Sequence, residues 1–151
     1  MKRTSLLVTC LILIYNWANA QINPAKIDII RDSFGVPHIF GKTDPDVAYG
    51  LAWAHAEDDF VTIQQSLMAG KSMLAQYQGK KGASIDYIIH LLRIPELVEE
   101  KYESELSPAF KKLLEGYAAG LNAYANAHPK EVLLKKAFPV TPKDMVQYSV
   151  L

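Results

Sequence analysis

The stretch Arg31–Phe60, RDSFGVPHIFGKTDPDVAYGLAWAHAEDDF, decides the fold of this 151-residue chain. The residues just before it, 27–30, are rich in isoleucine and predict a half-buried strand. The chain then turns through 32–35, where Gly35 can adopt a positive φ at little cost. Residues 36–40 predict the returning strand. Together these features predict a β-hairpin that leads directly into a long amphipathic helix.

The start of that helix carries ordinary capping signals. Thr43 or Asp44 is expected to be the N-cap, with Pro45 at the first helical position. Apolar side chains then recur at steps of three and four residues down to about residue 68, which predicts one buried helical face. This stripe comprises Tyr49, Trp53, Ala56, Phe60, Ile63 and Leu67.

Three residues in this region constrain the backbone. Pro37 cannot donate a ladder hydrogen bond, so its strand is expected at an edge of the sheet. Gly50 lowers helix stability by about 1 kcal/mol relative to alanine. We therefore expect another backbone to approach closely at Gly50. Gly70 is expected to end or kink the helix.

Further helical segments are expected between residues 71 and 106. A short helix within 71–77 is followed by a flexible surface loop over 78–82. Ser84 is the expected cap of the next helix. Its predicted buried face comprises Ile85, Ile88, Ile89 and Leu92. Pro95 is expected to break this helix before a glutamate-rich helix over 97–106.

Two serine- or threonine-proline pairs predict the last helices. Ser107-Pro108 starts one that ends at His128-Pro129; its apolar stripe comprises Phe110, Leu113, Leu114, Tyr117, Leu121 and Tyr124. Thr141-Pro142 starts another, whose apolar residues Met145, Val146, Tyr148, Val150 and Leu151 have no evident partner. Because short isolated helices and lone hairpins are marginally stable, we expect an α+β chain that is the N-terminal part of a larger protein.

Composition narrows the class of protein. Half of the residues are apolar, which is enough for a sizeable core. Acidic and basic residues number 16 each, and no basic patch or arginine-rich run occurs. Nucleic acid is therefore not expected as a partner.

Residues 1–20 have the pattern of a secretory signal peptide. Lys2 and Arg3 supply the positive start, 6–15 form an apolar run, and Ala18-Asn19-Ala20 is a small-x-small cleavage pattern. The apolar run is too short to span a bilayer comfortably, which argues against a retained anchor. We expect cleavage after Ala20 and a secreted or periplasmic mature chain over 21–151.

Two histidines are candidates for chemistry. His38 could act as a general base because imidazole titrates near neutrality, but a half-buried packing role with one ring nitrogen bonded to backbone is more common. His55 lies near Glu57, Asp58 and Asp59, which superficially resembles a metal cluster. Only His55 and Asp59 share a helical face at i and i+4, and two ligands do not make a site. We expect His55 to form an i, i+4 pair or to contact a neighbouring segment.

No serine or cysteine has the setting of a nucleophile, which needs a base and oxyanion donors. The G-x-S-x-G pattern does not occur. The expected places are helix caps for Ser84 and Ser107, the turn for Ser33, helical pattern for Ser66 and Ser72, and a glutamate-rich face for Ser104. Cys10, the only cysteine, lies in the signal segment, so the mature chain has no disulfide and no thiolate. Gly79 and Gly82 flank two lysines without phosphate-loop spacing. The residues assign no catalytic, cofactor-binding or metal-binding position.

Two motifs, in order, resemble the opening of the penicillin acylase family. The first is Arg31-Asp32-x-Phe34-Gly35-Val36-Pro37-His38-Ile39, and the second is Asp46-x-x-Tyr49-Gly50-x-x-x-Ala54-x-Ala56-Glu57-Asp58. LLEGYAAGLNAY, at 113–124, resembles a helix of the same family. The resemblance covers nearly all of 27–151. Asp59 departs from it, since the family usually has arginine there, and this puts the local ion-pair pattern in doubt.

The resemblance implies an amidohydrolase with an N-terminal nucleophile and an α-β-β-α sandwich. Such precursors are cut into an α chain and a β chain, and the nucleophile is the serine that begins the β chain. This chain would supply the first strands of the sandwich and part of the helical domain of the α chain. Its partners would be the rest of the α chain and the β chain. The pocket and any calcium ligands would lie beyond Leu151.

The implied substrates are acylated amides such as β-lactams or acyl-homoserine lactones. An alternative is a non-enzymatic secreted helical module that binds another protein. In that case the apolar stripe of the last helix would be its interface.

Overall fold

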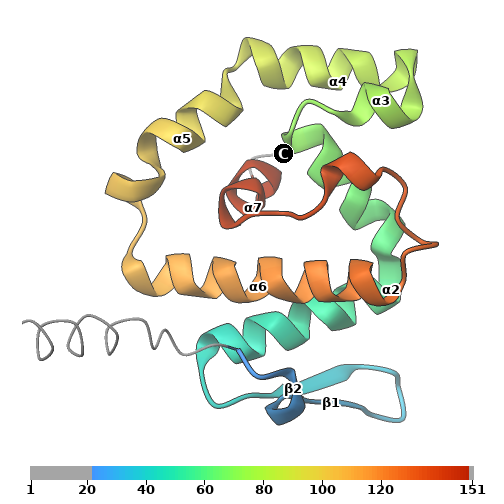
Figure 1. Cartoon of the computed structure of the whole chain (residues 1–151), viewed down its shortest axis with the longest axis vertical. Helices are drawn as coiled ribbons and strands as arrows, with labels where there is room; N and C mark the ends of the chain where they lie inside the picture. Colours follow the sequence, from blue (N-terminus) through green and yellow to red (C-terminus); the bar gives the residue numbers. More distant parts are fainter. Residues whose placement is uncertain (1–21, 150–151) are drawn as a thin grey trace, which may run out of the picture.

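The computed structural model describes residues 22–149, a mostly helical chain with one two-stranded antiparallel sheet (Figure 1). Its elements are η1 (Pro24–Lys26), β1 (Asp28–Arg31), β2 (Pro37–Phe40), α2 (Asp44–Gly70), α3 (Leu74–Gln78), α4 (Lys80–Leu91), α5 (Ile94–Glu105), α6 (Pro108–Ala127), η2 (Lys135–Ala137) and α7 (Pro142–Ser149). The signal-peptide prediction lies outside the described residues. Over 22–149, none of the helices combines the length and apolar character needed to span a bilayer.

Helix α2 is the element that most others contact. Its largest contact is with α6, while the hairpin, α7 and α4 also pack on it. Figure 1 shows α3, α4 and α5 following one another around an arc, with α7 lying inside that arc. The main core lies between α2, α5, α6 and α7.

The predicted hairpin is confirmed. Ile29 of β1 pairs with Ile39 of β2 at the centre of the register. Gly35 takes a φ of 84°, and its N–H donates to the carbonyl of Asp32 at 3.0 Å. Pro37 lies in the last pair of a two-stranded sheet, in an edge strand as expected.

The predicted start and end of α2 are also confirmed. The Asp46 N–H donates to Thr43 Oγ1, and Asp46 Oδ2 accepts from the Thr43 N–H at 3.1 Å, which is a capping box. The helix ends at Gly70. Of the predicted stripe, Tyr49, Ala56, Phe60 and Leu67 are buried, and Trp53 and Ile63 pack against the same core.

Two glycines bring α6 into contact with the backbone of α2. A Cβ added at Gly116 would lie 2.3 Å from the carbonyl oxygen of Pro45, and one at Gly120 would lie 2.3 Å from that of Tyr49. Residues four apart share a helical face, so both glycines meet successive turns of α2. A Cβ added at Gly120 would also lie 2.9 Å from the Cβ of Ala52 on α2, which is fully buried. The two helices can therefore lie this close together only because both of these α6 residues lack a side chain.

The expectation that a backbone approaches Gly50 is wrong in its partner. A Cβ at Gly50 would lie 2.6 Å from Cγ2 of Ile39 and 3.0 Å from Cγ2 of Ile27. The approach is close, but it comes from side chains at the start of the hairpin and in β2. Gly50 thus lets the hairpin rest directly on α2.

The predicted loop over 78–82 and the predicted cap at Ser84 are wrong, because α4 begins at Lys80. Gly82 is buried against α3, where a Cβ would lie 2.6 Å from the backbone carbon of Leu74. Asp86 of α4 accepts hydrogen bonds from the N–H groups of Leu74 and Ala75 at 2.9 and 2.8 Å. These tertiary contacts favour helix where local composition favours a loop.

The predicted buried face of α4 is also largely wrong. Ile89 is buried, but Ile85, Ile88 and Leu92 are exposed. The neighbours of α4 within residues 22–149 cover one side only. The predicted break at Pro95 is confirmed, since α5 starts at Ile94 with Pro95 in its first turn.

The last two helices start where expected. Ser107 caps α6 by accepting the Phe110 N–H, and His128 ends it. Phe110, at the start of the predicted α6 stripe, is nevertheless exposed. Helix α7 begins at Pro142, and Thr141 and Asp144 cap it reciprocally.

The expectation that α7 lacks a partner is wrong. Met145 is 4% exposed, and Val146 and Tyr148 pack against the main core. Lys71 Nζ lies 3.0 Å from Asp144 Oδ2, a half-buried ion pair that joins the ends of α2 and α7. The stripe that the protein-binding alternative uses as an interface is therefore mostly inside the core; Val150 and Leu151 lie outside the described residues.

Substituting Gly120→Ala tests the α2–α6 contact. The added methyl group would meet the Tyr49 carbonyl, so we expect the free energy of unfolding to fall by about 3 kcal/mol. Urea denaturation can be followed by the fluorescence of Trp53, the one tryptophan outside the N-terminal segment. Asn126→Gln, which adds a methylene on the exposed side of the same helix, should change it by less than about 0.5 kcal/mol. Equal stability of the Gly120→Ala variant and the unsubstituted chain would contradict the close contact.

Candidate functional site

The motif residues Arg31, Glu57 and Asp58 form one network where the hairpin meets α2. Arg31 Nη1 donates to the carbonyl of Gly35 at 2.8 Å. Its Nη2 lies 3.2 Å from Glu57 Oε2 and 2.8 Å from Asp58 Oδ1, and 3.4 Å from the carbonyl of Ala54. One guanidinium therefore joins the hairpin turn to two successive carboxylates of α2.

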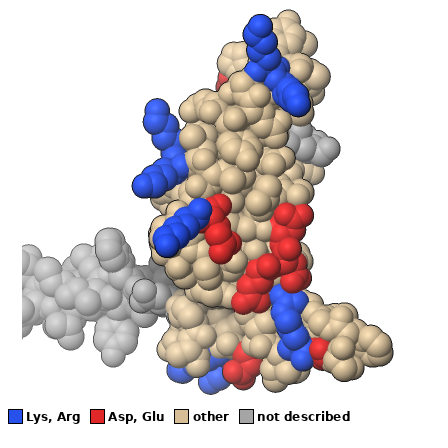
Figure 2. All heavy atoms as spheres, turned by 90° about the vertical axis from the view of Figure 1, so that its right-hand side faces the viewer, with Lys and Arg blue, Asp and Glu red and all other residues tan. Residues whose placement is uncertain are grey.

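The electrostatics of this network favour the charged form of Arg31. The carboxylates of Asp58 and, next, Glu57 raise the pKa of Arg31 above its ordinary value. Glu57 also accepts a hydrogen bond from Trp53 Nε1 at 2.9 Å. Figure 2 shows acidic side chains gathered next to a basic one at this junction. The arrangement supports a structural role, because each polar group is already engaged within the fold.

Asp32 organises the turn of the hairpin. Its Oδ1 accepts from the N–H groups of Phe34 and Val36 at 2.9 and 3.0 Å, and its Oδ2 lies 3.3 Å from His38 Nε2. The Val36 hydrogen bond, followed by the His38 side chain, lowers the pKa of Asp32. The carboxylate therefore remains ionised over the turn at neutral pH.

The expected setting of His38 is wrong. The side chain is exposed, with 53% of its surface accessible, and is not packed as expected. Its Nε2 faces the carboxylate of Asp32 rather than the backbone. Ile30, its partner across the hairpin, is also exposed, so this face of the sheet is open. The geometry connects His38 to the turn and to no reacting group.

His55 contacts a neighbouring segment, which is one of its two expected roles. Its Nδ1 lies 3.0 Å from the hydroxyl of Tyr117 on α6. Burial raises the pKa of Tyr117 to about 12, so the phenol stays protonated at neutral pH. The pair borders a hollow of about 240 Å³ lined by His55, Asp58, Asp59, Thr62, Ile63, Tyr117 and Tyr148.

Glu57 points away from His55, toward Arg31, as the helical spacing predicts. Among residues 22–149, no three histidine, cysteine, aspartate or glutamate side chains are placed to hold a metal ion. Any calcium ligands that the family resemblance implies are expected beyond Leu151, outside the described residues.

Asp59 has a role that the sequence did not reveal. Its φ and ψ of −157° and 72° interrupt α2, and its Oδ1 accepts from the Thr62 N–H at 3.0 Å. That hydrogen bond lowers the pKa of Asp59. Asp59 thus caps the second half of α2. Asp58, next to it, forms an ion pair with Arg31 of the hairpin.

The serines discussed from the sequence lie at a helix cap, in turns and on helices within residues 22–149. Ser107 is the predicted cap, Ser33 lies in the turn, and Ser66 is within α2. Ser104 donates to the carbonyl of Lys101 on α5. The prediction that Ser72 is helical is wrong, because Ser72 follows the end of α2 with a φ of 52°.

The outer face of the hairpin is apolar and open. Phe34 is 91% exposed, and Ile30, Val36 and Phe40 are each more than half exposed. Both strands also have an unpaired edge in this two-stranded sheet. Exposed apolar strands with free edges are the usual surface for adding further strands.

Comparisons with known proteins show what this chain is similar to. The sequence model of the family described as penicillin amidase matches residues 26–150. Penicillin G acylase of Escherichia coli is 28% identical over 159 residues, covering 99% of this chain and 19% of the relative. Acyl-homoserine lactone acylase PvdQ of Pseudomonas fluorescens (strain Pf-5) is 27% identical over 113 residues, covering 70% of this chain and 14% of the relative.

A solved structure shows the same fold. Thermostable penicillin G acylase from Alcaligenes faecalis superimposes with a TM-score of 0.68 at 24% identity, over 82% of this chain and 70% of that chain. The chain spans less than a fifth of the length of the two curated relatives.

Replacing Asp59 tests its role as a cap. Asp59→Ala removes the acceptor for the Thr62 N–H, so we expect a lower melting temperature by circular dichroism. Asp59→Asn keeps an acceptor oxygen and should melt closer to the unsubstituted chain. If the alanine variant melts no lower than the asparagine variant, the second half of α2 does not depend on this cap.

The lowered pKa of Asp32 predicts a pH dependence. Its ionised form stabilises the fold above about pH 4, where an unfolded aspartate is ionised, and this contribution is lost as pH falls through the lower folded pKa. Asp32→Asn should therefore destabilise the chain more at pH 7 than at pH 3, as measured by urea denaturation. Asp59 and Glu103, whose pKa values are also lowered, are present in both proteins and cancel. An equal loss at both pH values would contradict the assignment.

Proposed function

This chain belongs to the penicillin amidase family, and on that premise we propose that it is the N-terminal part of an exported amide hydrolase. The proposed reaction removes the acyl group from a β-lactam, an acyl-homoserine lactone or a similar amide. The observation that supports this proposal is the family match across 26–150, together with relatives named as penicillin and acyl-homoserine lactone acylases.

The chemistry is proposed to come from a later part of the precursor. The motif side chains Arg31, Asp32 and Glu57 are engaged in contacts that hold the hairpin. We assign the nucleophile to a serine that becomes the first residue of a β chain. Its free α-amine would act as the general base through a water molecule. This chain then acts as scaffold for that site.

The open face of the hairpin supports the proposal that this chain is a scaffold for a site formed by a later part of the precursor. Its exposed apolar side chains and unpaired edges would be covered by further strands of the sandwich in the complete enzyme. The partners proposed for this chain are therefore the rest of the α chain and the β chain. Export is proposed to follow from residues 1–20, with cleavage after Ala20.

Expression of the gene in a Gram-negative host tests both proposals. Residues 1–151 alone should give no hydrolysis of a chromogenic phenylacetyl amide or of an acyl-homoserine lactone above the blank. The same chain extended by the reading frame that follows codon 151 should be cut in two and hydrolyse one of them.

Three results would contradict the account. They are turnover by residues 1–151 alone, an absence of any coding sequence after codon 151, and an extended product that is neither cut nor active. N-terminal sequencing of the exported protein should begin at Gln21; an intact N-terminus in the periplasm would overturn the cleavage.

A further inference from the structure

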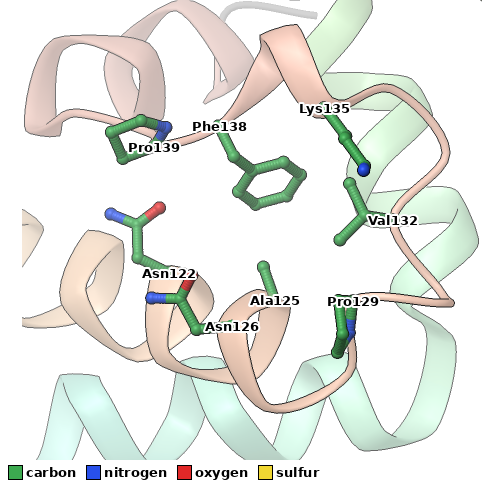
Figure 3. Close-up of a pocket in the computed structure, with 8 residues that line it drawn as sticks. All are labelled: Asn122, Ala125, Asn126, Pro129, Val132, Lys135, Phe138 and Pro139. Atoms are coloured by element: carbon green, nitrogen blue, oxygen red, sulfur yellow. The ribbon is translucent and has the colours of Figure 1, made fainter.

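A groove of about 460 Å³ lies between the end of α6 and the segment that leads to α7 (Figure 3). Its lining residues are Asn122, Ala125, Asn126, Pro129, Val132, Lys135, Phe138 and Pro139. Figure 3 shows the ring of Phe138 pointing into the middle, with Val132 and Lys135 on one side and the two asparagines on the other. The size is within the range of small-ligand sites, and the walls are mainly apolar.

The walls of this groove are fixed by buried polar contacts. Asn122 donates to the carbonyl of Val140 and accepts from its N–H, both at 2.8 Å. Gln64, only 1% exposed, donates to the carbonyl of Glu131 at 3.0 Å and accepts from the Leu133 N–H at 2.8 Å. Both ends of the 131–140 segment are thus tied to helices, and the groove is preformed.

Lys135 supplies the positive charge in the lining of the groove. Lys130 and Lys136 lie on the same segment of the chain, as does the acidic residue Glu131. The carboxylate of Glu131 accepts from the hydroxyl of Tyr124. Within residues 22–149, Lys135 forms no ion pair. An anion in the groove would therefore meet the unpaired positive charge of Lys135.

We propose that this groove binds small carboxylic acids with an apolar body, such as medium-chain alkyl or aryl acids. The apolar body would contact Ala125, Val132 and Phe138, and the carboxylate would face Lys135. Asn126 also lines the groove and has no hydrogen-bond partner among the described residues. Its amide N–H would donate to the same carboxylate. Acids of this class are also products of the proposed reaction, but their binding in the groove does not depend on that reaction.

Titration of the isotope-labelled full chain by NMR tests the groove directly and needs no catalysis. Octanoate should give saturable amide shifts that are centred on 122–139. Octylamine should bind at least threefold more weakly, because its cation meets the positive charge of Lys135. Added salt should weaken octanoate binding.

A substitution separates charge from apolar contact. Lys135→Met keeps the apolar stem and should weaken octanoate about threefold, a factor typical of an exposed ion pair, with octanol binding unchanged. Lys112→Met, on an exposed side of α6, is the matched control and should change neither ligand. The proposal is overturned if octanoate causes no saturable shifts, if octylamine binds equally well, or if Lys135→Met binds octanoate as tightly as the unsubstituted chain.

Discussion

The contact of Gly116 and Gly120 with the carbonyls of Pro45 and Tyr49 is the constraint on which the rest of the structure depends. Close-packed interiors leave no room for an added carbon between two backbones. By fixing α6 on the first turns of α2, this contact places the aromatic core of Phe60 and Tyr124 behind it. The segment that follows α6 can then return to the far end of α2.

Two further glycines extend the same principle along α2. Gly50 leaves room for the isoleucine side chains of the hairpin. Gly70 lets the backbone of α7 approach, because a Cβ added at Gly70 would lie 3.0 Å from the backbone nitrogen of Tyr148. The hairpin, α6 and α7 therefore each lie against α2 at a point where one of the two contacting residues is a glycine. Arg31 then fixes the hairpin in orientation by pairing with Glu57 and Asp58. The residues through which the family is recognised are thus mainly the ones that assemble this scaffold, which is why their recognition identifies the family without revealing a reacting group.

Local signals predicted the hairpin and the capped starts of α2, α6 and α7. They failed where a distant contact decides. Residues 78–82 have the composition of a loop, but Gly82 lies against α3 and Asp86 supplies hydrogen bonds to it. Met145 is buried although no partner is visible for it in the sequence, because the helices that contact α7 are α2, α5 and α6. The cap at Asp59 was hidden within an unbroken apolar stripe, whereas the four-residue spacing of Gly116 and Gly120 was a readable signal of close helix contact.

Native-state hydrogen exchange of the backbone amides tests the central place of the α2–α6 contact most directly. Regions held by the most extensive packing open only with global unfolding. The slowest exchange is expected at the facing turns of the two helices, around Tyr49–Ala56 and Ala118–Leu121, with faster exchange in α4 and the hairpin. Slowest exchange in α4 or in the hairpin, with α2 and α6 opening first, would contradict this account.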